Sequence, residues 1–452
     1  MKYLRIIICF LFFPLTANGK ADQDSIRLAL KHMEDGLKTK EIAVAQKSFA
    51  PEFSISIYSL PFASGLLKQI MEGITFQSIQ PDWKRMKTKG NVTSLEVRFT
   101  LAGGQEEKSM IAFNESGKIL FVDYFDRLFG DSRYRKSSLA AVLPFRIEGG
   151  SIILYARLND SPRVMSFLLD TGADGMAIRR SLADSIGLKV SHSQEASVVG
   201  GRKTVQISAD NVLRLSDSLS LKKQNIAIFE RVRNGTDGII GLNLIRKYIT
   251  EVNFDTQTIS LYTFGDYIFQ RKGRMIPLRV PSLIMLPSVL NLTGDKSISG
   301  NFIMDTGANY YLIAFSRFVR QNRLLLSGFK PEGSGATVSL GHSTPVFYGH
   351  ARSLKVGSVV SKNVPVTLQA STGGDSSNHT DVDGSIGIQF FSDFNFFVTS
   401  LNTNASLESF KTSLSFSSSV ISSMIDSYSD GISASRDSFI LSSKLSSLRI
   451  VS

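Results

Sequence analysis

Hydrophobic and polar positions follow two different periods in the first third of the chain. Over residues 24–49, apolar residues recur three or four positions apart, as in Ile26, Leu30, Met33 and Leu37, which predicts an amphipathic helix. The later stretches "SLEVRFTLAG" and "KSMIAFNESGKILFVDYF" alternate with a period of two around an Asn-Glu-Ser-Gly turn, which predicts antiparallel strands. A helix followed by antiparallel strands predicts a small α+β domain over residues 24–135.

From about residue 140 the chain becomes rich in strand patterns, and one pattern occurs twice. Each copy has a strand-like segment, an Asp-Thr-Gly-Ala motif and a later glycine motif. The glycine motif is Ile-Ile-Gly in the first copy and Ser-Ile-Gly in the second. The motif aspartates, Asp170 and Asp305, lie 27 and 29 residues after Leu143 and Ile276, where the repeated segments begin. The later glycines, Gly241 and Gly387, follow those aspartates by 71 and 82 residues. Matching landmarks in one order predict a duplicated β unit, with lobes over residues 140–268 and 273–411.

The two motif aspartates are the candidate catalytic residues. Each follows an apolar run typical of a buried strand, so each carboxyl group is expected at a buried strand end. Two carboxyl groups a few ångströms apart cannot both ionise easily and share one proton. One then takes a proton from water while the other donates a proton to an amide carbonyl oxygen. Asp170 and Asp305 are therefore predicted to activate water for attack on an amide, with no metal, cofactor or covalent intermediate. An acidic optimum is expected, and hydrogen bonds and burial set its exact position.

The neighbours of each aspartate suit this chemistry. Thr171 and Thr306 supply short hydroxyl groups that can hydrogen-bond across a pseudo-twofold interface. Gly172 and Gly307 let backbone N–H groups approach the carboxylates without an intervening side chain. The later segments are expected to pack behind the two loops, where only glycine leaves room. Those segments contain Ile240 and Gly241 in the first copy, and Ser385, Ile386 and Gly387 in the second, where Ser385 replaces an apolar residue.

The doubled motif resembles that of the aspartic proteases of the retropepsin and pepsin clan, from about residue 140 to about residue 410. The resemblance implies a mainly β, bilobal pepsin-like or retropepsin-like double β-barrel with Asp170 and Asp305 as its dyad. It also implies a hairpin in each lobe that closes over the substrate, although plain surface hairpins are the alternative. The candidate flaps are residues 197–206, with Gly200 and Gly201, and residues 333–343, with Gly333 and Gly335, whose glycines allow tight turns.

The end of the first domain, "GKILFVDYFDRLFG", resembles the nuclear-transport-factor-like fold but has no catalytic signature. Its Asp123 and Asp126 are expected to be turn or cap residues. The last segment, residues 412–452, contains 17 serines and no sustained period. That composition predicts a flexible serine-rich tail.

The N-terminus has the pattern of a secretory signal. Lys2 and Arg5 precede a short apolar run and a small-residue exit, which favours a cleaved signal peptide over residues 1–19 rather than a membrane anchor. The single cysteine, Cys9, lies inside it, so the mature chain is expected to contain no thiol or disulfide. No later segment is long and apolar enough to predict a membrane span. The protein is therefore expected to be periplasmic or secreted.

Charge and motif content exclude several other classes. The formal net charge is +12, but the basic residues are scattered, which is typical of a solvated surface and leaves weak attraction to anionic envelope polymers as the alternative. No nucleic-acid-binding motif, His-Glu-x-x-His metal motif, Gly-x-Ser-x-Gly elbow or phosphate-binding glycine loop occurs. The sequence predicts an exported, monomeric aspartic endopeptidase that acts on peptides or proteins. The alternative is a non-catalytic peptide- or envelope-binding protein that retains the fold.

Overall fold

The computed structural model of the chain describes residues 21–56, 58–198, 201–233, 235–267, 274–278, 283–294, 296–339, 342–370, 382–399, 412–417 and 448–450. The chain divides into two compact units, one of Met1–Phe53 with Ser64–Phe125 and one of Ser54–Ala63 with Asp126–Ser452. The predicted signal peptide, including Cys9, lies outside the described residues. Among the described helices, none combines the length and the apolar character that a membrane span requires.

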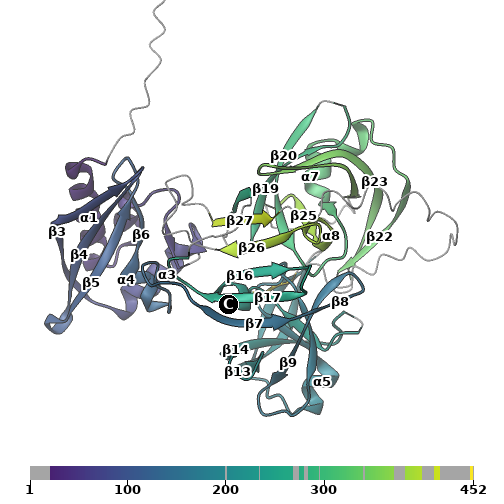
Figure 1. Cartoon of the computed structure of the whole chain (residues 1–452), viewed down its shortest axis with the longest axis horizontal. Helices are drawn as coiled ribbons and strands as arrows, with labels where there is room; N and C mark the ends of the chain where they lie inside the picture. The colour runs from purple at the N-terminus through teal and green to yellow at the C-terminus, as the bar shows by residue number, and fades with distance from the viewer. Residues whose placement is uncertain are drawn as a thin grey trace, which may run out of the picture. The chain divides into compact units, whose positions relative to one another are not determined.

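The first unit pairs helices with one antiparallel sheet (Figure 1). Helix α1 (Gln23–Thr39) begins at Asp22, whose side chain accepts the Ser25 backbone N–H at 2.8 Å. Its apolar residues at the predicted spacing are buried. This unit combines helices with an antiparallel sheet, while the predicted bounds of residues 24–135 and the nuclear-transport-factor-like resemblance stay predictions. The remaining elements are α2 (Ile42–Ala45), η1 (Gln46–Ser48), α3 (Phe62–Gly73), and a sheet of β3 (Phe76–Lys89), β4 (Val92–Leu101), β5 (Glu106–Phe113) and β6 (Ile119–Val122), in that order, with η2 (Ala102–Gly104) between β4 and β5.

The second unit begins with the short strands β1 (Ser54–Ile55) and β2 (Tyr58–Ser59), resumes at Asp126 within α4 (Asp123–Leu128) and then forms two lobes. In lobe 1, six strands form a closed ring in the order β13, β14, β11, β15, β10, β9, and β9 returns to β13 through the pair Leu213↔Leu158. The ring strands are β9 (Ser151–Leu158), β10 (Met165–Leu169), β11 (Met176–Arg179), β13 (Gly201–Arg214), β14 (Ser220–Phe229) and β15 (Gly238–Ile240). The other elements are β8 (Arg146–Glu148), β12 (His192–Val198), α5 (Arg180–Ser185) and α6 (Leu242–Ile245).

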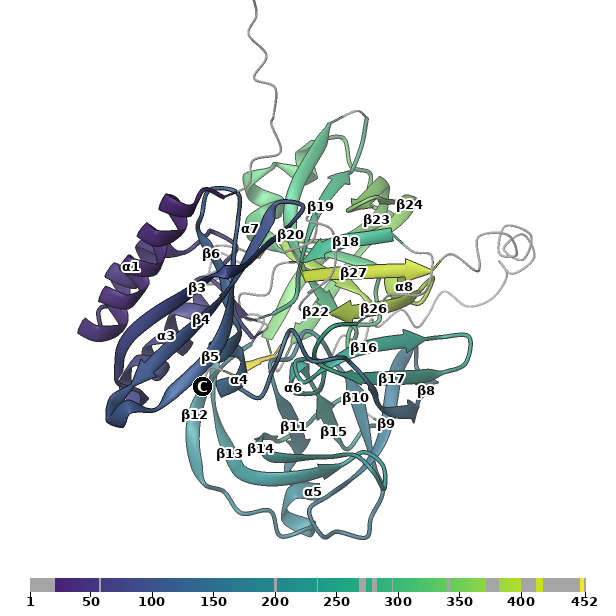
Figure 2. The same cartoon turned by 60° about the vertical axis from the view of Figure 1, so that its left-hand side comes forward.

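Lobe 2 repeats this ring with equivalent strands. The order is β23, β24, β21, β25, β20, β19, and β19 returns to β23. The predicted bilobal β fold is therefore confirmed, and Figure 2 shows lobe 1 in teal and lobe 2 in green. The strands are β19 (Met285–Asn291), β20 (Ser297–Asp305), β21 (Leu312–Ala314), β22 (Gly333–Ser339), β23 (His342–Val356), β24 (Val359–Gln369) and β25 (Gly384–Gly387), with α7 (Ser316–Gln321), η3 (Leu324–Leu326) and α8 (Ile388–Phe391).

A third sheet in this unit is built from both lobes. Lobe 1 gives β7 (Leu139–Pro144), β16 (Tyr248–Asn253) and β17 (Thr258–Thr263), and the rest of the chain gives β18 (Arg274–Leu278), β26 (Asn395–Thr399) and β27 (Thr412–Ser417). The two halves join where β16 pairs with β26, as Figure 1 shows.

The segment predicted as a serine-rich tail contributes to the sheets. Strand β27 lies between β18 and β26, and β28 (Leu448–Ile450) pairs with β12. In residues 412–417, serine alternates with a larger residue, which is a strand period. The serine content of the whole segment does not reveal this short period. It also does not show which strands will pair with it.

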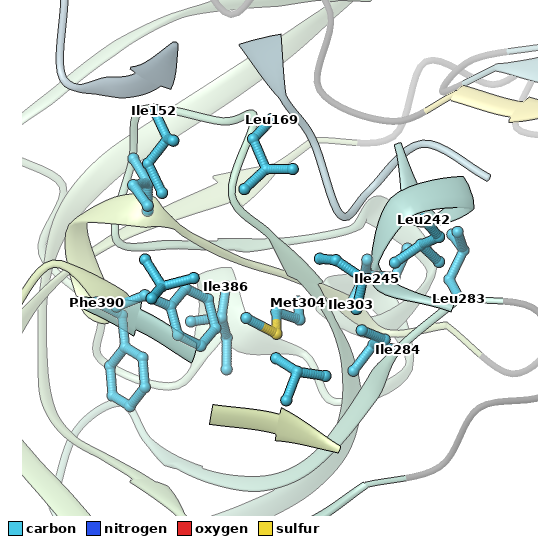
Figure 3. Close-up of a cluster of buried hydrophobic side chains, with 14 of the residues drawn as sticks. Ile152, Leu169, Leu242, Ile245, Leu283, Ile284, Ile303, Met304, Ile386 and Phe390 are labelled. Atoms are coloured by element: carbon cyan, nitrogen blue, oxygen red, sulfur yellow. The ribbon is translucent and has the colours of Figure 1, made fainter. Parts of the chain in front are cut away.

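The hydrophobic core reaches the ends of the strands that carry the motif aspartates. Buried side chains of both lobes belong to one continuous cluster. The residues directly before the aspartates, Leu169 and Met304, are fully buried in it, and Figure 3 shows them with Ile386 and Phe390. Because interiors are closely packed, both strand ends are held in place.

Candidate active site

The two predicted catalytic aspartates occupy equivalent positions in the two lobes. Asp170 directly follows β10, and Asp305 is the last residue of β20. Each strand pairs in parallel with the strand that carries its lobe's later glycine motif, β15 or β25. Both aspartate side chains have no exposed surface. The duplicated fold therefore places each carboxyl group at a buried strand end, as the apolar runs predict.

The structure brings the two carboxyl groups together. A Cβ atom added to Gly307 would lie 2.3 Å from Cγ of Asp170, and one added to Gly172 would lie 2.9 Å from Cγ of Asp305. Each motif loop therefore touches the carboxyl group of the opposite lobe, and any side chain larger than glycine would displace it. The two carboxyl groups are close enough to influence each other's titration, so they can share one proton.

Two threonines join the motif loops by reciprocal hydrogen bonds. The Thr171 hydroxyl donates to the Met304 carbonyl oxygen at 2.6 Å and accepts the Thr306 backbone N–H at 3.0 Å. The Thr306 hydroxyl donates to the Leu169 carbonyl oxygen at 2.8 Å and accepts the Thr171 backbone N–H at 3.1 Å. Both threonines are fully buried. Four bonds thus fix the two strand ends that precede the aspartates.

The later glycine motifs lie directly behind the aspartate loops. A Cβ atom added to Gly241 would lie 2.3 Å from the Gly175 carbonyl oxygen, and one added to Gly387 would lie 2.1 Å from the Tyr310 carbonyl oxygen. Only glycine leaves room for this approach. The preceding Ile240 and Ile386 are fully buried and anchor the motifs in the core.

The two carboxyl groups have unequal acidities. Burial raises the pKa of Asp170 to about 6, while the Gly172 backbone N–H, which donates to its Oδ1 at 2.8 Å, and the charge of Arg233 act in the opposite direction. Burial, together with the negative charge of Asp170, raises the pKa of Asp305 well above its ordinary value. Asp170 therefore ionises first, and Asp305 keeps its proton to higher pH.

Each carboxyl group also has one oxygen that is not committed to the protein. Among the described residues, Asp170 Oδ2 and Asp305 Oδ1 have no hydrogen-bond partner, although both are buried. A buried oxygen of this kind can bind water or substrate. This leaves one oxygen on each carboxyl group available for chemistry.

Sequence reasoning missed two residues around the dyad, Tyr310 and Arg233. The Tyr310 hydroxyl donates to Asp305 Oδ2 at 3.3 Å and also hydrogen-bonds to Ser385. Arg233 donates to the Gly149 carbonyl oxygen at 2.8 Å and lies close enough to Asp170 to influence its titration. The departure of Ser385 from an apolar residue is the signal that points to Tyr310, whereas nothing in the sequence around Arg233 predicts its position.

The candidate flaps are both hairpins, but their glycines differ in place. Strands β12 and β13 pair up to Val198↔Gly201, so Gly201 begins β13, and Gly200 lies outside the described residues. In the second hairpin, Gly333 and Gly335 lie within β22 and not at its turn, so their predicted turn role is wrong. Closure of either hairpin over a substrate stays a prediction.

The position of Gly333 has a steric reason. It pairs with Tyr348 on β23, and an added Cβ atom would lie 2.2 Å from the Tyr348 hydroxyl oxygen. The glycine therefore makes room for an aromatic side chain of the neighbouring strand. In the parts of the chain that the structure describes, no cluster of three His, Cys, Asp or Glu side chains could hold a metal ion.

Comparisons with known proteins find a solved structure and a family model that are similar to parts of this chain. The structure is similar to the crystal structure of an aspartic proteinase from Irpex lacteus, with 14% sequence identity, a TM-score of 0.38, and coverage of 63% of this chain and 97% of that one. A search of curated protein sequences finds no match. Residues 154–244, which include Asp170 and Gly241, match the family model described as aspartyl protease. Over these residues, the lobe that carries Asp170 therefore resembles the aspartyl protease family.

Proposed function

We propose that this protein is an exported aspartic endopeptidase in which Asp170 and Asp305 activate one water molecule against a peptide bond. The observation that carries the proposal is the meeting of two buried carboxyl groups from duplicated loops, each touched by the glycine of the opposite loop. The aspartyl protease family match over residues 154–244 supports a peptide substrate. Export rests on the signal-like N-terminal pattern of the sequence.

The unequal acidities assign a role to each carboxyl group. Asp170 is the base, because its Oδ1 accepts the Gly172 N–H and its Oδ2 is free of protein partners in the described structure. Asp305 is the acid, because burial and the adjacent negative charge raise its pKa well above the ordinary value. One buried pair thus supplies a proton acceptor and a proton donor at the same pH.

The proposed reaction proceeds in two proton-balanced steps. Water loses a proton to Asp170 while its oxygen bonds to the scissile carbonyl carbon, and Asp305 gives its proton to the carbonyl oxygen. The resulting diol collapses when the C–N bond breaks. The departing nitrogen takes the proton from Asp170, and one diol hydroxyl returns a proton to Asp305, so both carboxyl groups regain their starting states.

Proteolysis by purified protein tests the proposal. The substrates are denatured casein and a peptide library, assayed from about pH 3 to about pH 8. Asp170→Asn and Asp305→Asn should each lower kcat by about a thousandfold or more. Asp160→Asn is the matched control, because its side chain is fully exposed, and it should cleave like the wild type.

Two results would contradict the proposal. Cleavage that survives in both dyad variants would remove the dyad as its source. Absence of cleavage by the wild type, together with retention of library peptides, would instead identify a binding protein that keeps the fold.

A further inference from the structure

Lobe 2 contains a pair of buried hydroxyl groups that is hydrogen-bonded to one member of the dyad, Asp305. The Tyr310 hydroxyl lies 3.3 Å from Asp305 Oδ2 and also hydrogen-bonds to the Ser385 hydroxyl. Tyr310 is 7% exposed and Ser385 is 1% exposed. The hydroxyl of Tyr310 is thus held between a core serine on β25 and the carboxyl group of Asp305.

The fold itself does not require this pair, because lobe 1 lacks it. The Tyr310 carbonyl oxygen faces Gly387 as the Gly175 carbonyl oxygen faces Gly241, so Gly175 is the equivalent of Tyr310. Ser385 pairs with the residue two positions before Asp305, and Ile239 pairs with the residue two positions before Asp170. Glycine and isoleucine have no side-chain hydroxyl. The hydroxyl pair therefore distinguishes the two halves of a duplicated site.

The direction of the hydrogen bonds follows from the number of protons available. A phenol has one proton, and Tyr310 uses it on Asp305 Oδ2, so Ser385 donates its own proton to the Tyr310 oxygen. Burial and the charge of Asp305 raise the pKa of Tyr310 well above its ordinary value, so Tyr310 remains a donor throughout the working pH range.

A donor on one carboxyl oxygen decides where the carboxyl proton resides. Because Oδ2 of Asp305 accepts from Tyr310, the proton of the neutral Asp305 is left to Oδ1. Oδ1 is also the Asp305 oxygen nearest the Cβ position of Gly172, and it has no partner among the described residues. The proton therefore points toward lobe 1 and Asp170.

We propose that Tyr310, held by Ser385, is a positioning residue that keeps the proton of Asp305 on Oδ1 and restrains the rotation of that carboxyl group. This inference rests on the proposed function of the dyad. The groups in the described structure that act on Asp305 are Asp170, Tyr310 and the Gly307 backbone, and Arg233 acts on Asp170. Removal of the Tyr310 hydroxyl should therefore change the acid of the pair more than the base.

The pH dependence of kcat/KM tests the inference with Tyr310→Phe. The Tyr310 hydrogen bond favours ionised Asp305, so its loss should move the alkaline limb of the profile upward by about half to one pH unit. The same variant should lower kcat by about threefold to tenfold with little change in KM, because the carboxyl group is less well oriented. Tyr311→Phe is the matched control, since the ring of the adjacent tyrosine packs against Phe390 instead, and it should leave the alkaline limb in place.

A second readout does not depend on proteolysis. Infrared difference spectra can follow the protonated carboxyl band of Asp305 through a pH titration, with Asp305→Asn to assign the band. In Tyr310→Phe this band should persist to higher pH than in the wild type, and its frequency should change because Oδ2 loses its donor. If the wild type cleaves no substrate, the proposed function fails, while this titration still decides the role of Tyr310.

Ser385→Ala provides a variant that keeps the tyrosine in place. It removes the hydroxyl that fixes Tyr310, so it should shift the alkaline limb and the infrared titration in the same direction by a smaller amount. The inference is overturned if folded Tyr310→Phe or folded Ser385→Ala titrates like the wild type in both measurements. A shift of equal size in Tyr311→Phe would also overturn it, because the effect would then be general to the loop.

Discussion

The reciprocal threonine bonds give the sharpest stability prediction. Thr171→Val keeps the shape of the side chain but removes two of the four bonds, those to the Met304 carbonyl oxygen and from the Thr306 backbone N–H. Both backbone groups are then left buried without their partner. An unsatisfied buried group costs about 1–3 kcal/mol, so the free energy of unfolding should fall by about 3 kcal/mol.

Urea unfolding of the whole chain, followed by circular dichroism in the tyrosine region, measures this loss. With a denaturant slope of about 3 kcal/mol/M, the midpoint should fall by about 1 M urea. Trp83 is the only tryptophan and lies on β3 of the first unit, so its fluorescence reports that unit separately. The circular dichroism transition should move, and the Trp83 transition should stay near its wild-type midpoint.

The control for this variant is another fully buried threonine. Thr250 on β16 makes one hydroxyl bond of 3.3 Å, to the carbonyl oxygen of nearby Tyr248, so Thr250→Val should cost less than about 1 kcal/mol. The double variant Thr171→Val/Thr306→Val should be non-additive, because the two side chains share one network. If Thr171→Val lowers the free energy of unfolding by no more than Thr250→Val does, the reasoning that these bonds hold the lobes in register is refuted.

Three further predictions concern other parts of the second unit. Gly307→Ala should abolish proteolysis in a folded protein, because its Cβ would lie 2.3 Å from a dyad carboxyl carbon, whereas Gly73→Ala, in α3 and with nothing within 4 Å, should retain activity. Arg133→Met should lower the free energy of unfolding in urea by about 3–5 kcal/mol, because it removes the guanidinium that lies 2.6 Å from the buried carboxylate of Asp126. Arg98→Met, at the exposed pair with Glu106, should cost at most about 1 kcal/mol. Burial raises the pKa of Asp170 from 3.8 to about 6, so between these pH values the folded state binds more protons than the unfolded state. The free energy of unfolding should therefore fall as pH rises through this window. In Asp170→Asn, urea unfolding measured across the same window should show a weaker dependence of this free energy on pH.

The sequence predicts much of the fold because the repeat constrains it twice. The apolar runs before Asp170 and Asp305 end in equivalent strands, and the later glycines lie behind the loops where the spacing suggests. The hydrophobic pattern of each strand and the order of the repeated motifs can both be recognised in the sequence alone. The strand at Thr412–Ser417 was not readable in this way, because its pairing partners lie far away in the chain.

The electrostatic details of the site could not be read from the sequence. The Asp-Thr-Gly-Ala motifs suggest an acidic optimum, but complete burial moves the pKa of Asp170 to about 6, which places its ionisation nearer neutrality. Asp126 looks like a turn or cap residue, yet it is fully buried and ion-paired with Arg133 at 2.6 Å. The desolvation of a carboxyl group and the identity of its ion-pair partner depend on segments that are distant in the sequence, so both are known only from the folded structure.

The sheet shared by the lobes has a consequence for synthesis of the protein. Strand β16 leaves the ribosome well before β26, the strand that covers its edge, because about 140 residues separate them in the chain. During that interval the nascent first half presents bare backbone donors and acceptors, a surface prone to pairing with any neighbouring polypeptide. Truncation after the first half would make this interval permanent, so that half-molecule would associate with a second copy or aggregate.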